Sequence, residues 1–180
     1  MAKELSVSEE TFRQLLANEI EATEKLVKHM RPTSLLPRFV VIGQEGEGQP
    51  QTTRVFALDV SFNDNDAKHK LFKSLGARCY AEKFCPLAAF LTTEAWLSKQ
   101  TDVQPRKDPD RQEVAIISGR SIDGKQDCMA VAPIFRDTGD IIRLGKFNSG
   151  FAETQSLILK TFFESFMLTA FKDLKGKGRL

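Results

Sequence analysis

The chain has 180 residues, of which 41% are hydrophobic and 28% charged, and its formal net charge at pH 7 is +2. This length is enough to bury a core without a disulfide or metal, so we predict a single domain over residues 1–180. The small net charge gives no field that would draw the protein to nucleic acid or membrane, and no apolar run approaches the roughly 18 residues of a membrane span. The first ten residues contain no apolar signal segment, which favours a cytoplasmic protein.

Cysteine and histidine usage argues against a disulfide framework, a metal centre or a bound cofactor. The three cysteines, Cys79, Cys85 and Cys128, are an odd number without the paired spacing of a zinc or redox motif. The two histidines, His29 and His69, lie on separate segments. We therefore expect reduced thiols and no metal site built from histidine or cysteine, and we assign no cofactor.

The N-terminal segment predicts an amphipathic helix. Ser6-Val7-Ser8-Glu9 matches a capping box, in which a serine caps the helix and a glutamate three residues later reaches back to it. Apolar residues then recur with a helical period as far as Met30. We expect this helix to end near Arg31 and Pro32.

A hairpin and a second helix are predicted next. The segments 38–43 and 52–62 are rich in Val and Phe, and the stretch between them contains glycines and a proline, which indicates a hairpin with a loose tip. The Asn and Asp residues at 63–66 are typical helix caps, so we expect a second helix there that ends before Pro86.

The second half of the chain predicts more antiparallel strands. After Pro86 we expect a strand as far as about Leu91. The residues that follow could equally form a turn of helix capped by Thr92 or Thr93, and a long loop comes after them. Three further apolar segments lie at residues 113–122, 127–135 and 141–147. Short turns with Asp and Gly separate them, which predicts a meander, and Pro133 should lie at an edge or a bulge. The complete order indicates an α+β fold, with a mostly antiparallel sheet of five to six strands and N-terminal, middle and C-terminal helices.

The C-terminal helix, closed by Gly176, is apolar around too much of its circumference for one sheet to cover. Its apolar side chains span about 220°, whereas a stripe that faces a core needs only about 100°. We expect a second partner for this helix, which is either the first helix of the same chain or another copy of the protein. In a homodimer, the predicted interface residues are Phe162, Phe163, Phe166 and Met167.

The stretch QPRKDPDRQE, residues 104–113, is the strongest candidate for a ligand site. It holds three carboxylates, three cations and two prolines in ten residues. Carboxylates are the ligands that Mg²⁺ and Ca²⁺ prefer, and Arg106, Lys107 and Arg111 are available for a phosphate. The predicted ligand-binding residues are Glu94, Asp108, Asp110, Arg111 and Glu113. The same stretch is also compatible with a partner contact or with a plain solvated connector.

Other possible sites have a simpler structural interpretation. Pro109-Asp110 and Asp123-Gly124-Lys125 have the spacing of a metal-dependent nuclease motif, but the second group is predicted to be a hairpin tip, one strand length from the first. A cysteine nucleophile at Cys79 or Cys85 would need a histidine beside it, and His69 is almost three helical turns from Cys79. We assign no catalytic residue.

The basic C-terminal tail, residues 172–180, carries four cations and one acid. A tail this short neutralises few phosphates, and the chain lacks the interleaved aromatic residues of a single-strand binder. We interpret it as a solubilising terminus and do not expect a nucleic-acid partner.

The segment FLTTEAWLSK, followed past the loop by DPDRQEVAIISG and a DGK hairpin, resembles an uncharacterised type of bacterial protein. In that type an EAW segment precedes a PDR-E-V strand. The resemblance covers about forty residues and implies a shared fold and a bacterial cytosolic origin. It implies no activity.

The sequence as a whole favours a non-enzymatic interaction or assembly protein that self-associates through its C-terminal helix. Large apolar surface left uncovered marks an association site, and the predicted partner is a second copy or another protein. The alternative is an enzyme or binding protein that holds a divalent metal or a small ligand with the carboxylates around residues 104–113.

Overall fold

Three helices and seven strands make up the part of the chain that the computed structural model describes, which comprises residues 6–46, 49–58, 64–98, 104, 107–151 and 156–177. The helices are α1 (Glu9–Met30), α2 (Asn65–Ala81) and α3 (Leu157–Gly176). The strands are β1 (Arg38–Gln44), β2 (Gln51–Ala57), β3 (Cys85–Leu97), β4 (Gln112–Ser121), β5 (Asp127–Arg136), β6 (Ile142–Leu144) and β7 (Asn148–Phe151). The predicted α+β class is confirmed, with seven strands in place of five to six.

The strands form one antiparallel sheet in the order β2-β1-β3-β4-β5-β6, and β7 also pairs with β5. The predicted β1–β2 hairpin and the β4–β5–β6 meander are both present. The end of β3 was predicted too early, because β3 continues to Leu97 in register with the start of β4, where Trp96 pairs with Glu113. This extension carries the sheet up to the 104–113 segment.

Pro133 lies within β5, at the point where its outer neighbour changes. β7 pairs with β5 as far as Val131, and β6 takes over at Ile134. Between them the Pro133 carbonyl accepts a hydrogen bond from the Gly145 amide at 2.8 Å. The missing N–H of proline points to the same side, into the junction of two strands, so no ladder bond is lost there.

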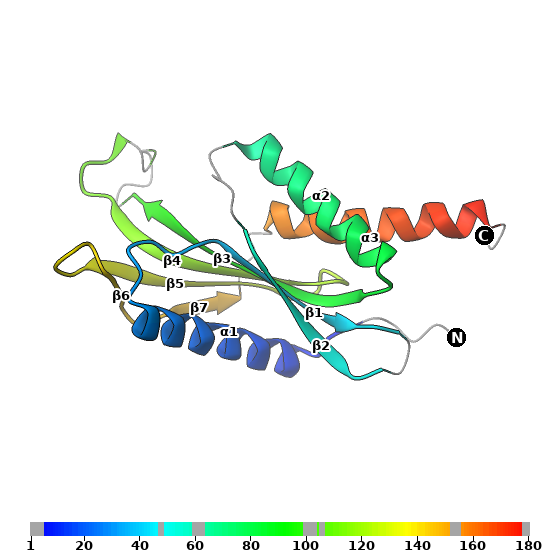
Figure 1. Ribbon diagram of the computed structural model, residues 1–180, viewed down its shortest axis with the longest axis horizontal. Coiled ribbons are helices and arrows are strands. Elements are labelled where there is room, and N and C mark those ends of the chain that lie inside the picture. Colours follow the sequence, from blue (N-terminus) through cyan, green and yellow to red (C-terminus); the bar gives the residue numbers. More distant parts are fainter. Residues whose placement is uncertain are drawn as a thin grey trace.

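The helices cover the two faces of the sheet separately (Figure 1). α1 lies on one face, where Phe12 stacks on Phe90 of β3 with ring centroids 5.3 Å apart. α2 and α3 lie together on the other face, over Phe39 of β1. The prediction that α3 could pack on the first helix is therefore wrong. The helix that α3 packs against within the chain is α2. The sheet lies between α3 and α1.

Helix caps match the predicted positions closely, with one correction. The N-cap of α1 is Ser8, whose Oγ accepts a hydrogen bond from the Thr11 amide at 3.2 Å, so the capping box from Ser6 to Glu9 does not begin the helix. The helix ends as predicted, with Arg31 as its C-cap in the left-handed region (φ 47°). Asp64 caps α2 by accepting from the Asp66 amide at 2.8 Å.

A buried ion pair fixes α1 on the sheet. Glu19 of α1 accepts a hydrogen bond from Arg38 of β1 at 2.5 Å, and their side chains are only 7% and 18% exposed. Thr92 of β3 donates to the same carboxylate at 3.0 Å, and Arg38 also donates to Thr23 at 3.1 Å. Among the described residues, the Arg38 Nε has no hydrogen-bond partner. The α1 contact thus contains a polar network between two apolar regions.

α2 and α3 cross in close contact. A Cβ at Gly76 of α2 would lie 2.3 Å from the Phe162 backbone oxygen of α3, so only glycine fits there. Ser165 donates to the Lys73 carbonyl at 2.8 Å, and Tyr80 donates to Asp173 at 2.7 Å. These contacts hold α3 at a fixed angle.

Within the described ranges, none of the helices is apolar over enough residues to traverse a bilayer.

Candidate interaction site

The predicted interface phenylalanines are core residues. Phe162, Phe163 and Phe166 are 0%, 3% and 7% exposed, and they pack against the sheet and α2. Phe162 meets Phe39 edge to face, with ring centroids 5.0 Å apart. A side chain already buried in its own subunit has no surface left for a second copy, so the interface prediction is wrong for these three residues. Met167 differs, because it is 52% exposed.

A second apolar group occupies the outer side of the same helix. We call it the outer α3 stripe. It consists of Met167, Leu168, Phe171 and Leu174, which are 52%, 54%, 54% and 38% exposed. Met167, Phe171 and Leu174 recur every three to four residues and Leu168 lies three residues before Phe171, so the four side chains fall within about 120° of the helix circumference. Single exposed apolar residues are normal on a protein surface, whereas four within eight residues of one helix form a patch.

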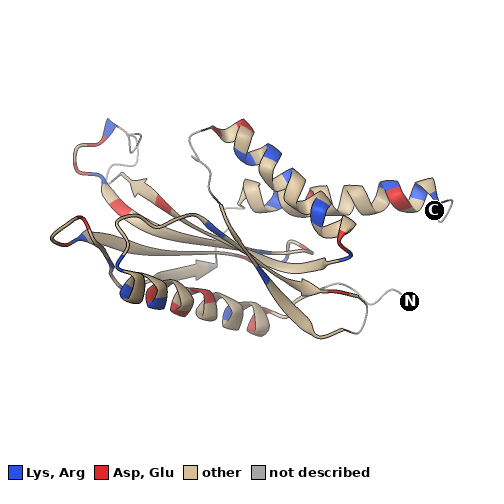
Figure 2. Cartoon of the chain, in the orientation of Figure 1, with Lys and Arg blue, Asp and Glu red and all other residues tan. Residues whose placement is uncertain are grey.

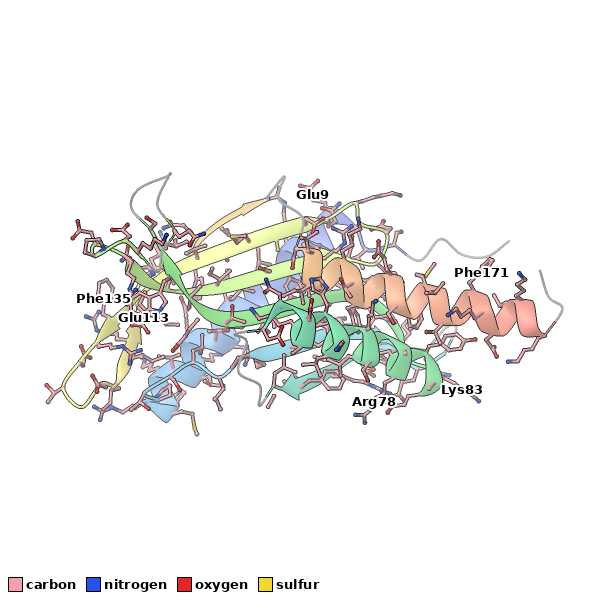
Figure 3. All side chains as sticks on the ribbon, turned by 90° about the horizontal axis from the view of Figure 1, so that it is seen from above. Glu9, Arg78, Lys83, Glu113, Phe135 and Phe171 are labelled. Atoms are coloured by element: carbon pink, nitrogen blue, oxygen red, sulfur yellow. The ribbon has the colours of Figure 1, made fainter. Side chains whose placement is uncertain are left out.

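The stripe faces away from the body of the molecule. On a helical projection it is centred roughly 120° from the buried phenylalanines. Figure 3 shows Phe171 on the side of α3 opposite α2, and Figure 1 shows the last turns of α3 extending past the strands, while Tyr80 of α2 still reaches Asp173 on the inner side of the helix. The projecting half of α3 is therefore accessible to a second molecule over several turns.

Charged residues lie at both ends of the stripe. Glu164 stands one turn before it and forms an exposed ion pair with Lys160 at 3.7 Å. Lys175 follows it in the last turn of α3 and is exposed. Figure 2 shows the charged residues gathered on helices and loops, with few on the middle of the sheet. An apolar centre with charged ends is the usual composition of an interaction surface.

Two of the predicted ligand-binding carboxylates, Glu94 and Glu113, have structural partners at one end of the sheet. The Arg136 guanidinium binds both oxygens of Glu113, with Nε to Oε2 at 2.8 Å, and donates to the Thr33 carbonyl at 2.9 Å. Glu94 accepts from the Leu35 amide at 2.5 Å. These contacts attach the segment before β1 to β3, β4 and β5.

The ionised Glu94 carboxylate destabilises the folded state. Burial raises the pKa of its carboxyl above the ordinary value of 4.5, and the nearby Glu113 charge adds to the rise, against the Leu35 amide and Arg136. A raised pKa in the folded state means that folding favours the protonated form, so the ionised form reduces stability once the pH exceeds that pKa.

Glu94→Gln should therefore stabilise the protein at neutral pH. Glutamine keeps an oxygen that can accept from the Leu35 amide, and it carries no charge. Thermal unfolding of both proteins should show the glutamine variant as the more stable above the raised pKa, with the difference vanishing below pH 4.5. If the two proteins differed in stability by the same amount at neutral pH and below pH 4.5, ionisation of the Glu94 carboxyl would not be the cause.

The other predicted ligand-binding residues organise the loop before β4. Asp108 is 2% exposed and accepts from the Ser98 hydroxyl at 2.5 Å and from the Asp110 amide at 2.9 Å. The Arg111 guanidinium lies over the Trp96 ring, 4.6 Å from its centroid. Arg106 lies outside the described residues. Asp108 thus anchors a turn, while Asp110 and Arg111 are exposed beside it.

The four predicted carboxylates divide into these two groups, one at the strand ends and one in the loop. Among the residues that the structure describes, no group of three or more His, Cys, Asp or Glu side chains could hold a metal ion. The sequence did not show the structural roles of Glu113, Asp108 and Arg111. Their partners Arg136, Ser98 and Trp96 come from other segments.

The remaining candidate residues are also placed by the fold. Asp123-Gly124 forms the β4–β5 turn, with Gly124 at φ +67°, and β4 separates it from Asp110 by about 30 Å. Burial raises the pKa of the Cys79 thiol to about 11, so this thiol stays protonated at neutral pH. His69 contacts Thr161 of α3 at 2.9 Å, near the start of α2, whereas Cys79 lies near its end.

Comparison of the chain with models of protein families, with curated proteins and with solved structures found no match. The resemblance of the EAW and DPDR segments to a type of bacterial protein therefore stays a prediction. The outer α3 stripe is the described feature that points most directly to a function.

Proposed function

We propose that the protein is an interaction or assembly protein that forms a homodimer through the outer α3 stripe. The observation that carries this proposal is the exposure of four large apolar side chains, Met167, Leu168, Phe171 and Leu174, on the projecting half of α3. Leaving such a patch in water is unfavourable, and covering it is the dominant driving force of most protein association.

A second copy is the partner that fits the shape of this surface. Two identical helices can pack side by side about a two-fold axis, so that each stripe covers the other, which is the commonest symmetry of homo-oligomers. Because Phe171 lies on the side of α3 opposite α2, the partner helix can approach the stripe from outside, away from the Tyr80–Asp173 contact on the inner side. The buried face of α3 stays in its own core throughout.

The proposal predicts that a charge in the stripe separates the copies. Wild-type protein at tens to hundreds of micromolar should show twice the 20.2 kDa of one chain in light scattering after gel filtration. Leu168→Glu and Phe171→Glu should each raise the dissociation constant at least about 100-fold, because every dimer would bury two unpaired carboxylates.

The matched control is Leu36→Glu, which places the same charge at a residue that is 69% exposed and lies outside α3. This variant should remain dimeric, and circular dichroism should show unchanged helix content in all three variants. A wild-type protein of 20.2 kDa at every concentration would refute the proposal, as would equal loss of the dimer in the control.

A further inference from the structure

Two opposite charges lie at the ends of the outer α3 stripe, on the same side of the helix. Glu164 and Lys175 are eleven residues apart, which corresponds to about 16 Å along the axis and to only about 20° around it. Both side chains are exposed, Glu164 to 64%. The stripe residues Leu168 and Phe171 lie between them. A helix that presents this pattern has a direction, because its two ends carry different charges.

The charges discriminate between the two ways in which two copies of α3 could pair. In a parallel pair, Glu164 would face Glu164 of the partner subunit, and Lys175 would face Lys175 of the partner subunit, so both contacts would be repulsive. In an antiparallel pair centred between Thr169 and Ala170, Glu164 faces Lys175 of the partner subunit, and the reverse contact is the same. Symmetry thus yields two attractive contacts in one arrangement and two repulsive contacts in the other.

The apolar residues of the stripe also pair in this antiparallel arrangement. About the point between Thr169 and Ala170, Leu168 of one copy lies opposite Phe171 of the partner subunit, and each copy contributes both residues. The N-terminal half of α3 rests on its own sheet, so an antiparallel arrangement puts the two sheets at opposite ends of the helix pair. The bodies of the two subunits are then held apart.

We propose that the homodimer pairs α3 antiparallel, with Glu164 and Lys175 of each copy forming reciprocal ion pairs across the two-fold axis. This inference rests on the proposed function, since it specifies the geometry of that interface. The existing contact of Glu164 with Lys160, at 3.7 Å between exposed side chains, is a weak local pair that does not compete strongly. The two reciprocal pairs give the interface its polarity, and the stripe provides its affinity.

The test is a charge exchange. Glu164→Lys and Lys175→Glu should each raise the dissociation constant about tenfold at low salt, because every dimer would then hold two like-charge contacts. The double variant Glu164→Lys/Lys175→Glu should return to within about threefold of wild type, since both attractive pairs are re-formed with exchanged signs. Sedimentation velocity over a concentration series measures all four proteins.

The control is Lys70→Glu, which makes the same charge change as Lys175→Glu at an exposed position on α2. It should leave the dissociation constant unchanged. A dimer that is sensitive to Phe171→Glu but indifferent to both single reversals would overturn the antiparallel pairing while leaving the proposed function in place. Two weakened single variants without recovery in the double variant would also overturn it, and a monomeric wild type would overturn both proposals.

Discussion

Replacing Glu19 with alanine is expected to destabilise the protein by about 3–5 kcal/mol, the usual cost of removing one partner from a buried ion pair. The Arg38 side chain, which is only 18% exposed, would lose its principal acceptor, and its Nε already has no partner among the described residues. Thr92 would lose its acceptor as well. Urea unfolding followed by circular dichroism measures the change in free energy.

Two further variants make this prediction specific. Glu21→Ala, two residues along α1, removes an exposed ion pair with Lys25 and should cause no measurable change. The pair Glu19→Leu with Arg38→Met should recover most of the lost stability, because it removes both buried charges together. If Glu19→Ala cost less than about 1 kcal/mol, or if the double replacement were no better than the single one, the network would not stabilise the α1 contact as described.

The second large effect is expected at Phe162. This prediction distinguishes the buried side of α3 from its exposed side. Phe162 is 0% exposed and contacts the rings of Phe39 and Phe163, each with centroids 5.0 Å away. Phe162→Ala should therefore reduce the free energy of unfolding by about 3–5 kcal/mol through lost burial and the cavity left behind. Differential scanning fluorimetry and urea unfolding both report this loss.

The matched control is Phe171→Ala, which makes the same chemical change two and a half turns later on the same helix. Because Phe171 is 54% exposed, its replacement should cost the isolated subunit less than about 1 kcal/mol and instead weaken self-association. Comparable destabilisation of the subunit by both variants would contradict the assignment of one inner and one outer side to α3.

The excess of apolar residues on α3 was correctly read from the sequence, but the side that remains exposed was not. Periodicity places Phe162 and Phe171 on the helix circumference relative to each other, and it does not show where the sheet and α2 will lie. That depends on the close crossing at Gly76, which brings α2 against the backbone of α3 and encloses Phe162, Phe163 and Phe166. The predicted interface therefore contained mainly core residues.

Elements with local signals were predicted well. Asp64 caps α2, the Asp123-Gly124 turn joins β4 to β5, and the glycine-rich stretch separates β1 from β2. Where the outcome depended on pairing, the sequence was insufficient. β3 was predicted to stop near Leu91 because the residues after it could equally form a turn of helix capped by Thr92 or Thr93, yet β4 supplies a pairing partner as far as Leu97.

The residues around 104–113 illustrate the same limit for a candidate site. Their charges are close together in the sequence, but their partners come from distant segments. Arg136 of β5 reaches back 23 residues to Glu113, and Arg111 stacks on Trp96 across the loop. Local charge density could locate this region, and only the fold could show that Asp108 and Glu113 have partners of their own.

Sedimentation equilibrium of the wild-type protein over a wide concentration range tests the central claim most directly. The exposed stripe on α3 predicts a reversible transition from 20.2 kDa to twice that mass, shifted to higher concentration by Leu168→Glu and unaffected by Leu36→Glu. A constant mass of 20.2 kDa up to hundreds of micromolar would mean that no second copy covers the stripe.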